Sequence, residues 1–166
     1  EPGGSKNSEK IRNLILNKNS SFDELTDLFL YMAARNENFQ SIIKKNYKKK
    51  IILIDRFIDS TIAYQHYGMG INKKLIIYLN KFILKNIEPN FTFLNIVNMK
   101  NLKLRLKIRS KKNRYDNFNT NFYKKVQKGY IKLSKNEKKY MIINSNKKII
   151  DNKKIIIKKI NSLLTL

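Results

Sequence analysis

Three short apolar segments that alternate with amphipathic helical patterns constrain the fold of this chain more than any other feature. The apolar segments cover residues 49–55, 91–97 and 140–145. Helical patterns cover residues 7–16, 21–46, 72–87, 102–113, 121–133 and 149–163. No Asn-Gly or Asp-Gly dipeptide, the usual sign of a tight hairpin, occurs between the segments. Single strands that alternate with helices indicate βα units and right-handed crossovers, and therefore an α/β fold with a parallel sheet flanked by helices.

Local signals predict where several of these elements begin and end. Asn7 or Ser8 can cap the first helix. Ser21 and Glu24 have the spacing of a capping box and predict the start of the second. The segment 49–55, "KKIILID", is short, branched and bounded by lysines, which predicts a buried parallel strand.

Length and composition narrow the class of protein. The 166 residues suit one domain, and 42% of them are hydrophobic, enough for a real core. The chain has no cysteine, which excludes disulfides and cysteine-based zinc sites. No apolar run approaches the roughly 20 residues of a membrane span, and no signal peptide is visible. We therefore expect a cytoplasmic protein without a membrane partner.

The formal net charge of +24 allows two interpretations. A basic surface can bind nucleic acid, but the charge is spread along a chain crowded with Lys, Asn and Ile, which favours ordinary solvated lysines. Only six of the 36 cations are arginines. Because arginine grips phosphate or a base edge at two points, we expect these six to carry specific contacts: Arg12, Arg35, Arg56, Arg105, Arg109 and Arg114.

The segment "DRFIDSTIAYQ" follows the first predicted strand and supplies the densest set of functional groups. In parallel sheets, ligands lie outside the carboxyl ends of the strands, where Asp55 and Arg56 would stand. Arg56 can hold a phosphate and Asp55 can order the waters of a magnesium ion. A strand-end ion pair followed by an ordinary helix is the alternative. Hydroxyl, aromatic and amide groups follow on the next turns: Ser60, Thr61, Tyr64 and Gln65.

Three further groups of residues are weaker signs of function when each is taken alone. Glu1-Pro2-Gly3-Gly4 can form a turn whose backbone approaches a ligand closely. Tyr31 and Arg35 are four residues apart on one helix face, where a ring and a guanidinium can stack on a base and bind its edge. Arg105, Arg109 and Arg114 lie in a basic segment at about residues 105–120 that can close over phosphates.

Taken together and in this order, these motifs resemble those of bacterial thymidylate kinases. "EPGGS" and Ile11-Arg12 match the first substrate loop and the helix after it. Tyr31, Ala33 and Arg35 match the end of the long helix, and "DRF", "ST" and "AYQ" match at the family spacing. "NRYD" echoes the lid, with Asn113 and Asp116 in place of Asp and Glu. The resemblance covers nearly the whole chain.

The resemblance implies a three-layer P-loop nucleoside monophosphate kinase-like fold, and ATP, magnesium and dTMP as ligands. It implies that Tyr31 stacks on thymine and that Arg35 binds the edge of the base, helped by Ser60, Thr61 and Gln65. Arg12 and Arg56 would hold the substrate phosphate, and Tyr64 would favour deoxyribose. Asp55 and, indirectly, Glu1 would lie near the metal. Arg105, Arg109 and Arg114 would stabilise charge on the transferring phosphoryl group. Relatives of this kind are commonly homodimers.

The first strand and the phosphate-binding loop of the family, Gly-x-x-x-x-Gly-Lys-Ser/Thr, are not among these 166 residues. We therefore expect one kinase domain, truncated at its N-terminus, that cannot by itself turn over ATP. Two alternatives stay open at this point. One is a kinase for another nucleoside monophosphate. The other is a basic nucleic-acid-binding protein derived from a decayed kinase, which the spread of the charge makes less favoured.

Overall fold

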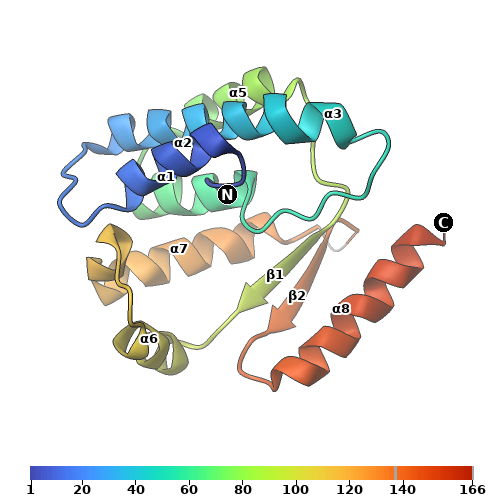
Figure 1. The fold of residues 1–166 in the computed structure, drawn as a ribbon. Helices are drawn as coiled ribbons and strands as arrows, with labels where there is room; N and C mark the ends of the chain where they lie inside the picture. The colour runs from blue at the N-terminus through green and yellow to red at the C-terminus, as the bar shows by residue number, and fades with distance from the viewer. Residues whose placement is uncertain (137, 166) are drawn as a thin grey trace. The chain divides into compact units, whose positions relative to one another are not determined.

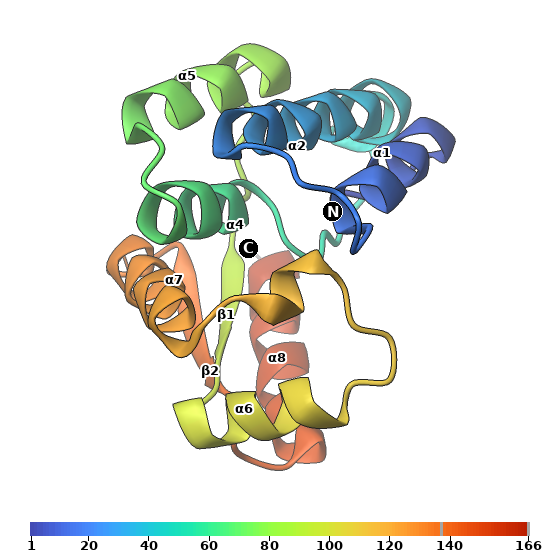
Figure 2. The same ribbon diagram turned by 90° about the vertical axis from the view of Figure 1, so that its left-hand side faces the viewer.

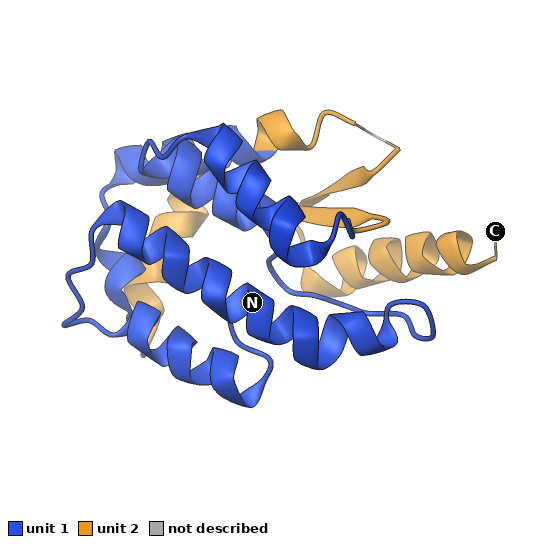
Figure 3. Cartoon of the chain, turned by 90° about the horizontal axis from the view of Figure 1, so that it is seen from above, with its two compact units in different colours: residues 1–88, 111–130 blue, residues 89–110, 131–166 orange. Residues whose placement is uncertain are grey.

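The computed structural model describes residues 1–136 and 138–165 and divides into two compact units. Unit 1 comprises Glu1–Glu88 and Lys111–Tyr130, and unit 2 comprises Pro89–Ser110 and Ile131–Leu166 (Figure 3). The chain therefore leaves unit 1, enters unit 2, returns, and leaves once more. Among the described residues, no helix is long and apolar enough to cross a membrane.

Unit 1 is helical, and it holds most of the predicted site residues (Figure 1). Its first part contains α1 (Lys6–Leu16), α2 (Glu24–Asn38), a π-helical turn η1 (Phe39–Ile43) and the short α3 (Lys44–Asn46). Next come α4 (Ile58–Thr61), a second π-helical segment η2 (Ile62–Gly68) and α5 (Lys73–Leu84). The returning chain adds a 3₁₀ turn η3 (Arg114–Asn117) and α7 (Thr120–Leu133), whose last turn enters unit 2.

The predicted helices are confirmed, but two of the predicted caps are wrong. Ser5 caps α1 and forms a capping box with Ser8. Asp23 caps α2 by accepting from the backbone N–H groups of Leu25 and Thr26, so Ser21 and Glu24 form no box. In both cases a small polar residue two or three positions away competes for the same orphan N–H groups, and sequence spacing alone does not choose between them.

Two apolar clusters hold unit 1 together. Phe39, Ile43 and Leu84 form one, which joins η1 to α5. Ala63, Phe122 and Val126 form the other, which joins η2 to α7. Because η2 contributes to the second cluster and α4 adjoins the first, the segment that carries the predicted substrate residues is fixed by packing at both ends.

Unit 2 contains the parallel sheet of the described residues. Strands β1 (Thr92–Ile96) and β2 (Tyr140–Asn144) pair in parallel, with Leu94 opposite Ile142 (Figure 2). Leu94 and Ile143 are the buried side chains of these strands. The helices α6 (Met99–Ile108) and α8 (Ile149–Leu164) follow β1 and β2 respectively, as βα units require.

The prediction of a buried strand at 49–55 is wrong. Ile51 is 65% exposed and Leu53 is 81% exposed, whereas Ile52 packs against the Phe39 cluster. The alternation suits a strand, but in the described residues the sheet consists of β1 and β2, and neither pairs with this segment. A strand needs a neighbour for its backbone hydrogen bonds, and without one the segment is an irregular connection.

Two glycines allow η2 and α7 to approach each other closely. A Cβ atom at Gly68 would lie 2.6 Å from the ring of Phe122. A Cβ atom at Gly129 would lie 2.4 Å from the ring of Tyr67 and 2.9 Å from the Cβ of the same residue. The second contact is near the backbone, so a rotation of Tyr67 cannot relieve it.

We therefore predict that Gly129→Ala lowers the free energy of unfolding by about 1–3 kcal/mol, because the added methyl overpacks the contact with Tyr67. Alanine normally favours a helix over glycine, so a destabilised variant would identify the close approach as the cause. Urea unfolding measures the change. Lys125→Ala on the exposed face of α7 is the control. An equal or higher stability of Gly129→Ala would contradict the packing.

Candidate active site

Arg35 is the centre of the candidate site. It is 2% exposed and lies near the end of α2. Its Nε and Nη2 atoms donate to the Glu1 carboxylate at 3.0 and 2.7 Å. Its Nη1 atom donates to Thr61 Oγ1 at 3.0 Å and to Asn80 Oδ1 at 2.6 Å. One buried cation therefore joins the N-terminal loop, α4 and α5 to α2.

The predicted loop Glu1–Gly4 is held by a residue that sequence reasoning missed. Asn38 donates through Nδ2 to the carbonyl oxygens of Pro2 and Gly3 at 3.1 and 2.9 Å. Its Oδ1 atom accepts from the Ser5 N–H at 3.0 Å and from Ser8 Oγ at 2.8 Å. Asn38 is 4% exposed and uses its whole amide, so the turn is built into the fold.

Gly3 and Gly4 of this loop are each required to be glycine, for different reasons. A Cβ at Gly3 would lie 2.0 Å from the Glu9 carboxylate, which itself accepts from the Gly4 N–H at 2.9 Å. Gly4 has φ +136°, which disfavours any side chain. Arg12 lies against Gly3 and is half-exposed, paired with Glu9 at 3.4 Å. The loop thus presents backbone and an accessible cation together.

The Asp-Arg turn places Arg56 above Tyr64. Arg56 has φ +63°, a left-handed backbone conformation that is uncommon outside glycine and that often marks functional positions. Its guanidinium carbon lies 5.1 Å from the ring centroid of Tyr64, and Nη2 lies 3.4 Å from the Tyr64 hydroxyl. The residue is exposed, so its remaining donors face solvent. The carbonyl oxygen of Asp55 accepts from the Glu1 nitrogen at 2.5 Å, which brings the two predicted metal residues together.

Three buried side-chain polar atoms of the described residues have no hydrogen-bond partner, and all three belong to predicted site residues. They are Oε1 of Glu1, Nε2 of Gln65 and Nε of Arg114. Gln65 is 1% exposed and sits in the π-helical segment η2, a distortion frequent at functional sites. Unpaired acceptors and donors are costly to bury, so these atoms are candidates for contact with a ligand or water.

Tyrosine rings connect the predicted base-binding and sugar-binding residues. Tyr115 lies edge to face with Tyr31 and with Tyr64, at centroid distances of 6.3 and 5.9 Å. Ser60 and the hydroxyl of Tyr130 share a hydrogen bond of 2.7 Å, and Tyr130 also contacts the Tyr64 ring. Tyr31 and Tyr64 are therefore brought to one aromatic cluster, and their roles at the base and the sugar stay predictions.

Burial sets the proton affinities of this cluster. It raises the pKa of the Tyr31 hydroxyl to about 12 and that of Tyr130 to about 12. Burial, the neighbouring Tyr31 and the Asp27 carboxylate raise the pKa of Tyr115 further. All three hydroxyls are therefore neutral at physiological pH and act through hydrogen bonds and ring contacts.

The arginines of the basic segment do not share one environment. Arg114 belongs to unit 1, where it pairs with the buried Asp27 of α2. Arg105 belongs to unit 2, where its Nη2 donates to the carbonyl oxygen of Ser145 at 2.7 Å. Arg109 is the C-cap of α6 in the same unit. The role of Arg105 and Arg109 in phosphoryl transfer stays a prediction.

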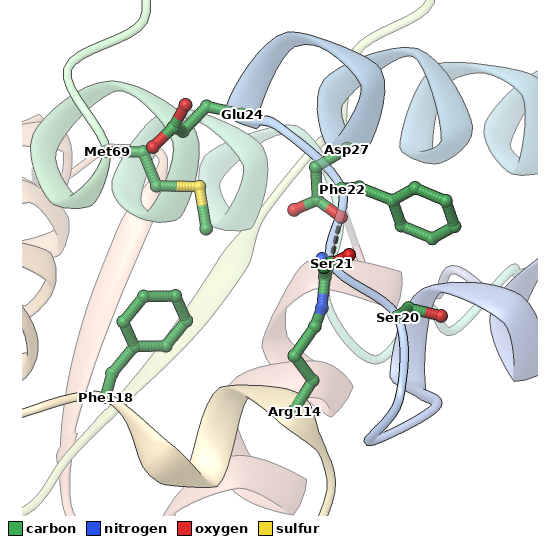
Figure 4. Close-up of a pocket in the computed structure, with 8 residues that line it drawn as sticks. All are labelled: Ser20, Ser21, Phe22, Glu24, Asp27, Met69, Arg114 and Phe118. Atoms are coloured by element: carbon green, nitrogen blue, oxygen red, sulfur yellow. Dashed lines mark hydrogen bonds and ion pairs between the residues drawn. The ribbon is translucent and has the colours of Figure 1, made fainter.

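Asp27, Asn38 and Asn80 were missed because their partners are distant in sequence. One signal could have found Asp27, since it precedes Tyr31 by four residues and Arg35 by eight and therefore shares their helix face. A pocket of about 280 Å³ lies beside Asp27 (Figure 4). Its lining includes Arg114 but none of the other predicted site residues: Ser20, Ser21, Phe22, Glu24, Asp27, Met69, Arg114 and Phe118.

The raised pKa of Tyr31 predicts a loss of stability at alkaline pH. The ordinary pKa is 10.0, and the folded protein holds the proton to about 12. Between these values the unfolded chain releases a proton that the folded protein keeps, so rising pH favours unfolding. We expect Tyr31→Phe to reduce this decline in the free energy of unfolding by roughly 1–3 kcal/mol between pH 10 and 12. Urea unfolding at each pH measures it, with the exposed Tyr47→Phe as control. Equal slopes in wild type and Tyr31→Phe would contradict the burial of this hydroxyl.

Comparison with known proteins places this geometry in a family. Residues 1–156 match the family described as thymidylate kinase. The thymidylate kinase of Sulfurihydrogenibium sp. (strain YO3AOP1) is 38% identical over 160 residues, which are 95% of this chain and 78% of the relative. That of Mycoplasma capricolum is 42% identical over 154 residues, which are 90% of this chain and 72% of the relative.

A solved structure extends the match to three dimensions. The crystal structure of thymidylate kinase from Ehrlichia chaffeensis superposes with a TM-score of 0.75 at 34% identity, covering 97% of this chain and 77% of that one. The match confirms the predicted α/β, P-loop-kinase-like fold class, although 49–55 is no strand. With buried Arg35 joining three motif segments and relatives matched along almost its entire length, the chain belongs to the thymidylate kinase family.

Proposed function

We propose that this protein transfers the γ-phosphoryl group of ATP to dTMP, giving dTDP, and that unit 1 carries the dTMP site. The observation that carries the proposal is the Arg35 network, because one buried cation gathers Glu1 and Thr61, which are far apart in sequence, beside the Tyr31 helix. Burying a charge is costly unless it is paired, so the fold is organised around this group of polar residues.

Each residue has a role that suits its environment. Tyr31 supplies a ring for the base, and Arg35, Thr61 and Gln65 supply polar groups for its edge, with Ser60 beside them. The Nε2 atom of Gln65 is buried and without a partner, which suits a donor that a pyrimidine carbonyl completes. Tyr64 lies under Arg56, where its ring would crowd the sugar.

Phosphate binding is assigned to Arg56 and Arg12. Both are exposed arginines, and each borders a backbone turn at the candidate site. Arginine holds phosphate through two parallel hydrogen bonds, which orients the group for in-line transfer. The lid arginines Arg105, Arg109 and Arg114 are assigned to the charge on the transferring group.

The carboxylates of Glu1 and Asp55 fit a magnesium site. The Oε1 atom of Glu1 is buried with no partner, and the backbone of Asp55 lies next to Glu1. Magnesium is usually held by one or two carboxylates together with phosphate oxygens and water. When bound, it neutralises charge on the phosphates.

A turnover assay tests the function. The protein expressed from its own initiator methionine is expected to release ADP from ATP when dTMP is supplied, with UMP and dCMP as poor substrates. Equal turnover with UMP would favour a kinase for another nucleoside monophosphate. Salt-dependent RNA or DNA binding without saturable dTMP binding would favour the basic nucleic-acid-binding alternative.

The phosphate and base contacts can be separated by calorimetry. We predict that Arg56→Gln weakens dTMP binding about 10- to 100-fold, because a charge-assisted bidentate contact is lost. Thymidine, which has no phosphate, should bind the variant and the wild type equally. Tyr31→Ala should weaken both ligands. Lys50→Gln, an exposed cation in the same connection, is the control. A parallel loss of thymidine affinity in Arg56→Gln would show that Arg56 has another role.

The family resemblance also favours a homodimer, and we propose the α2–α5 face as its interface. These helices pack together and expose Leu25, Phe29, Tyr78 and Phe82. Phe29 is 51%, Tyr78 65% and Phe82 63% exposed, and the last two rings are stacked at 6.4 Å. Clustered aromatic side chains on a surface mark an interaction site, and twofold symmetry pairs such a face with itself.

Light scattering after gel filtration tests the interface. We expect wild type at twice the chain mass of 19.7 kDa and Phe82→Glu at the mass of one chain. Ile108→Glu, which alters a still more exposed apolar residue on α6, should stay dimeric. A dimeric Phe82→Glu would place the interface elsewhere.

A further inference from the structure

Asp27 is a buried acidic residue of unit 1 that the predicted chemistry does not use. It is 1% exposed on α2, and both oxygens are engaged by the returning chain. Oδ1 accepts from Nη2 of Arg114, and Oδ2 accepts from the hydroxyl of Tyr115. A buried carboxylate that receives a guanidinium and a phenol from adjacent residues forms a two-point clamp on the η3 turn.

The clamped turn carries a ring of the aromatic cluster. Tyr115 is 7% exposed and lies edge to face with both Tyr31 and Tyr64, the residues assigned to the base and the sugar. The hydroxyl of Tyr115 is fixed by Asp27, and its carbonyl oxygen accepts from Tyr123 at 2.7 Å. The position of the Tyr115 ring therefore depends on its hydrogen bond to Asp27, which lies one helical turn before Tyr31 on α2.

The η3 turn has its own local order, and besides Asp27 it meets α2 through the Tyr31–Tyr115 ring contact. Asn113 caps it and forms a reciprocal pair with Asp116. Arg114 also lies over the rings of Phe22 and Tyr115, at 5.5 and 5.1 Å. In Figure 4 the Arg114 side chain extends from the turn toward Asp27, along the edge of the 280 Å³ pocket. Loss of the Asp27 carboxylate would leave the cap of the turn in place and remove the contacts of Arg114 and Tyr115 with that carboxylate.

We propose that Asp27 is a positioning residue that docks the Arg114–Tyr115 turn against α2 and thereby sets the Tyr115 ring as a wall of the pyrimidine site. The inference rests on the proposed dTMP site and deepens it, because it names the residue that completes the pocket. The affinity for the nucleoside then depends on the Asp27 carboxylate, which does not contact the ligand.

The test measures dTMP and thymidine binding by calorimetry and local opening by hydrogen exchange. Asp27→Asn keeps the shape and removes the charge. We expect it to weaken both ligands by about tenfold, since a hydrogen bond to a charged group is lost. Exchange should increase at residues 113–118 and stay unchanged along α1 and α5. Tyr115→Phe, which keeps the ring and the Arg114 pair, should weaken binding by a smaller factor. Glu37→Gln, an acid-to-amide change on α2 whose partner is Asn7, is the control.

A triple variant, compared with its parent double variant, separates positioning from general destabilisation. If Asp27 acts through the turn, Asp27→Asn added to Arg114→Gln/Tyr115→Phe should cost almost no further affinity, whereas independent effects would multiply. Asp27→Glu, which retains the charge, should recover part of the affinity. Unchanged dTMP affinity in Asp27→Asn, with wild type binding normally, would overturn the inference alone. Failure of wild type to bind dTMP would overturn the proposed substrate site and the inference with it.

Discussion

The buried guanidinium of Arg35 is the interaction on which the arrangement of unit 1 depends. A charge with 2% exposure must find partners in the protein, and it finds them on Glu1, Thr61 and Asn80. Removal of one partner from a buried charged network typically costs about 3–5 kcal/mol, because the remaining charge stays uncompensated. The N-terminal loop, α4 and α5 are therefore placed by electrostatics as well as by packing.

Apolar packing sets the positions of the helical segments more closely than the charged network does. The close approach of η2 and α7 at Gly68 and Gly129 fixes the distance between α7 and the segment that carries Tyr64 and Gln65. The π-helical winding of η2 changes the direction in which its side chains project relative to an α-helix. The polar groups of the site therefore project from a π-helical segment that tight packing holds in place. Such rigid support keeps polar side chains from rotating to pair with one another.

Sequence reasoning was most accurate where a signal is local. The helices and the parallel β1–β2 pair follow from periodicity and from short motifs. The placement of Glu1, Arg35 and Thr61 at one site is implied only by the family resemblance. Sequence reasoning was least accurate where the outcome depends on a distant partner. Residues 49–55 have the composition of a strand but no described neighbour to pair with. Asn38, Asn80 and Asp27 look like ordinary helical polar residues until the loop, the guanidinium and the turn that they bind are folded against them.

The aromatic cluster has a consequence for how this protein can be observed. The chain has no tryptophan and nine tyrosines. Four of the tyrosines, Tyr31, Tyr64, Tyr115 and Tyr130, sit in the cluster, in contact with one another in a fixed geometry. Near-ultraviolet circular dichroism arises from aromatic rings held in asymmetric surroundings and disappears when specific packing is lost. The near-ultraviolet spectrum of this protein therefore reports on the packing of this cluster without any label.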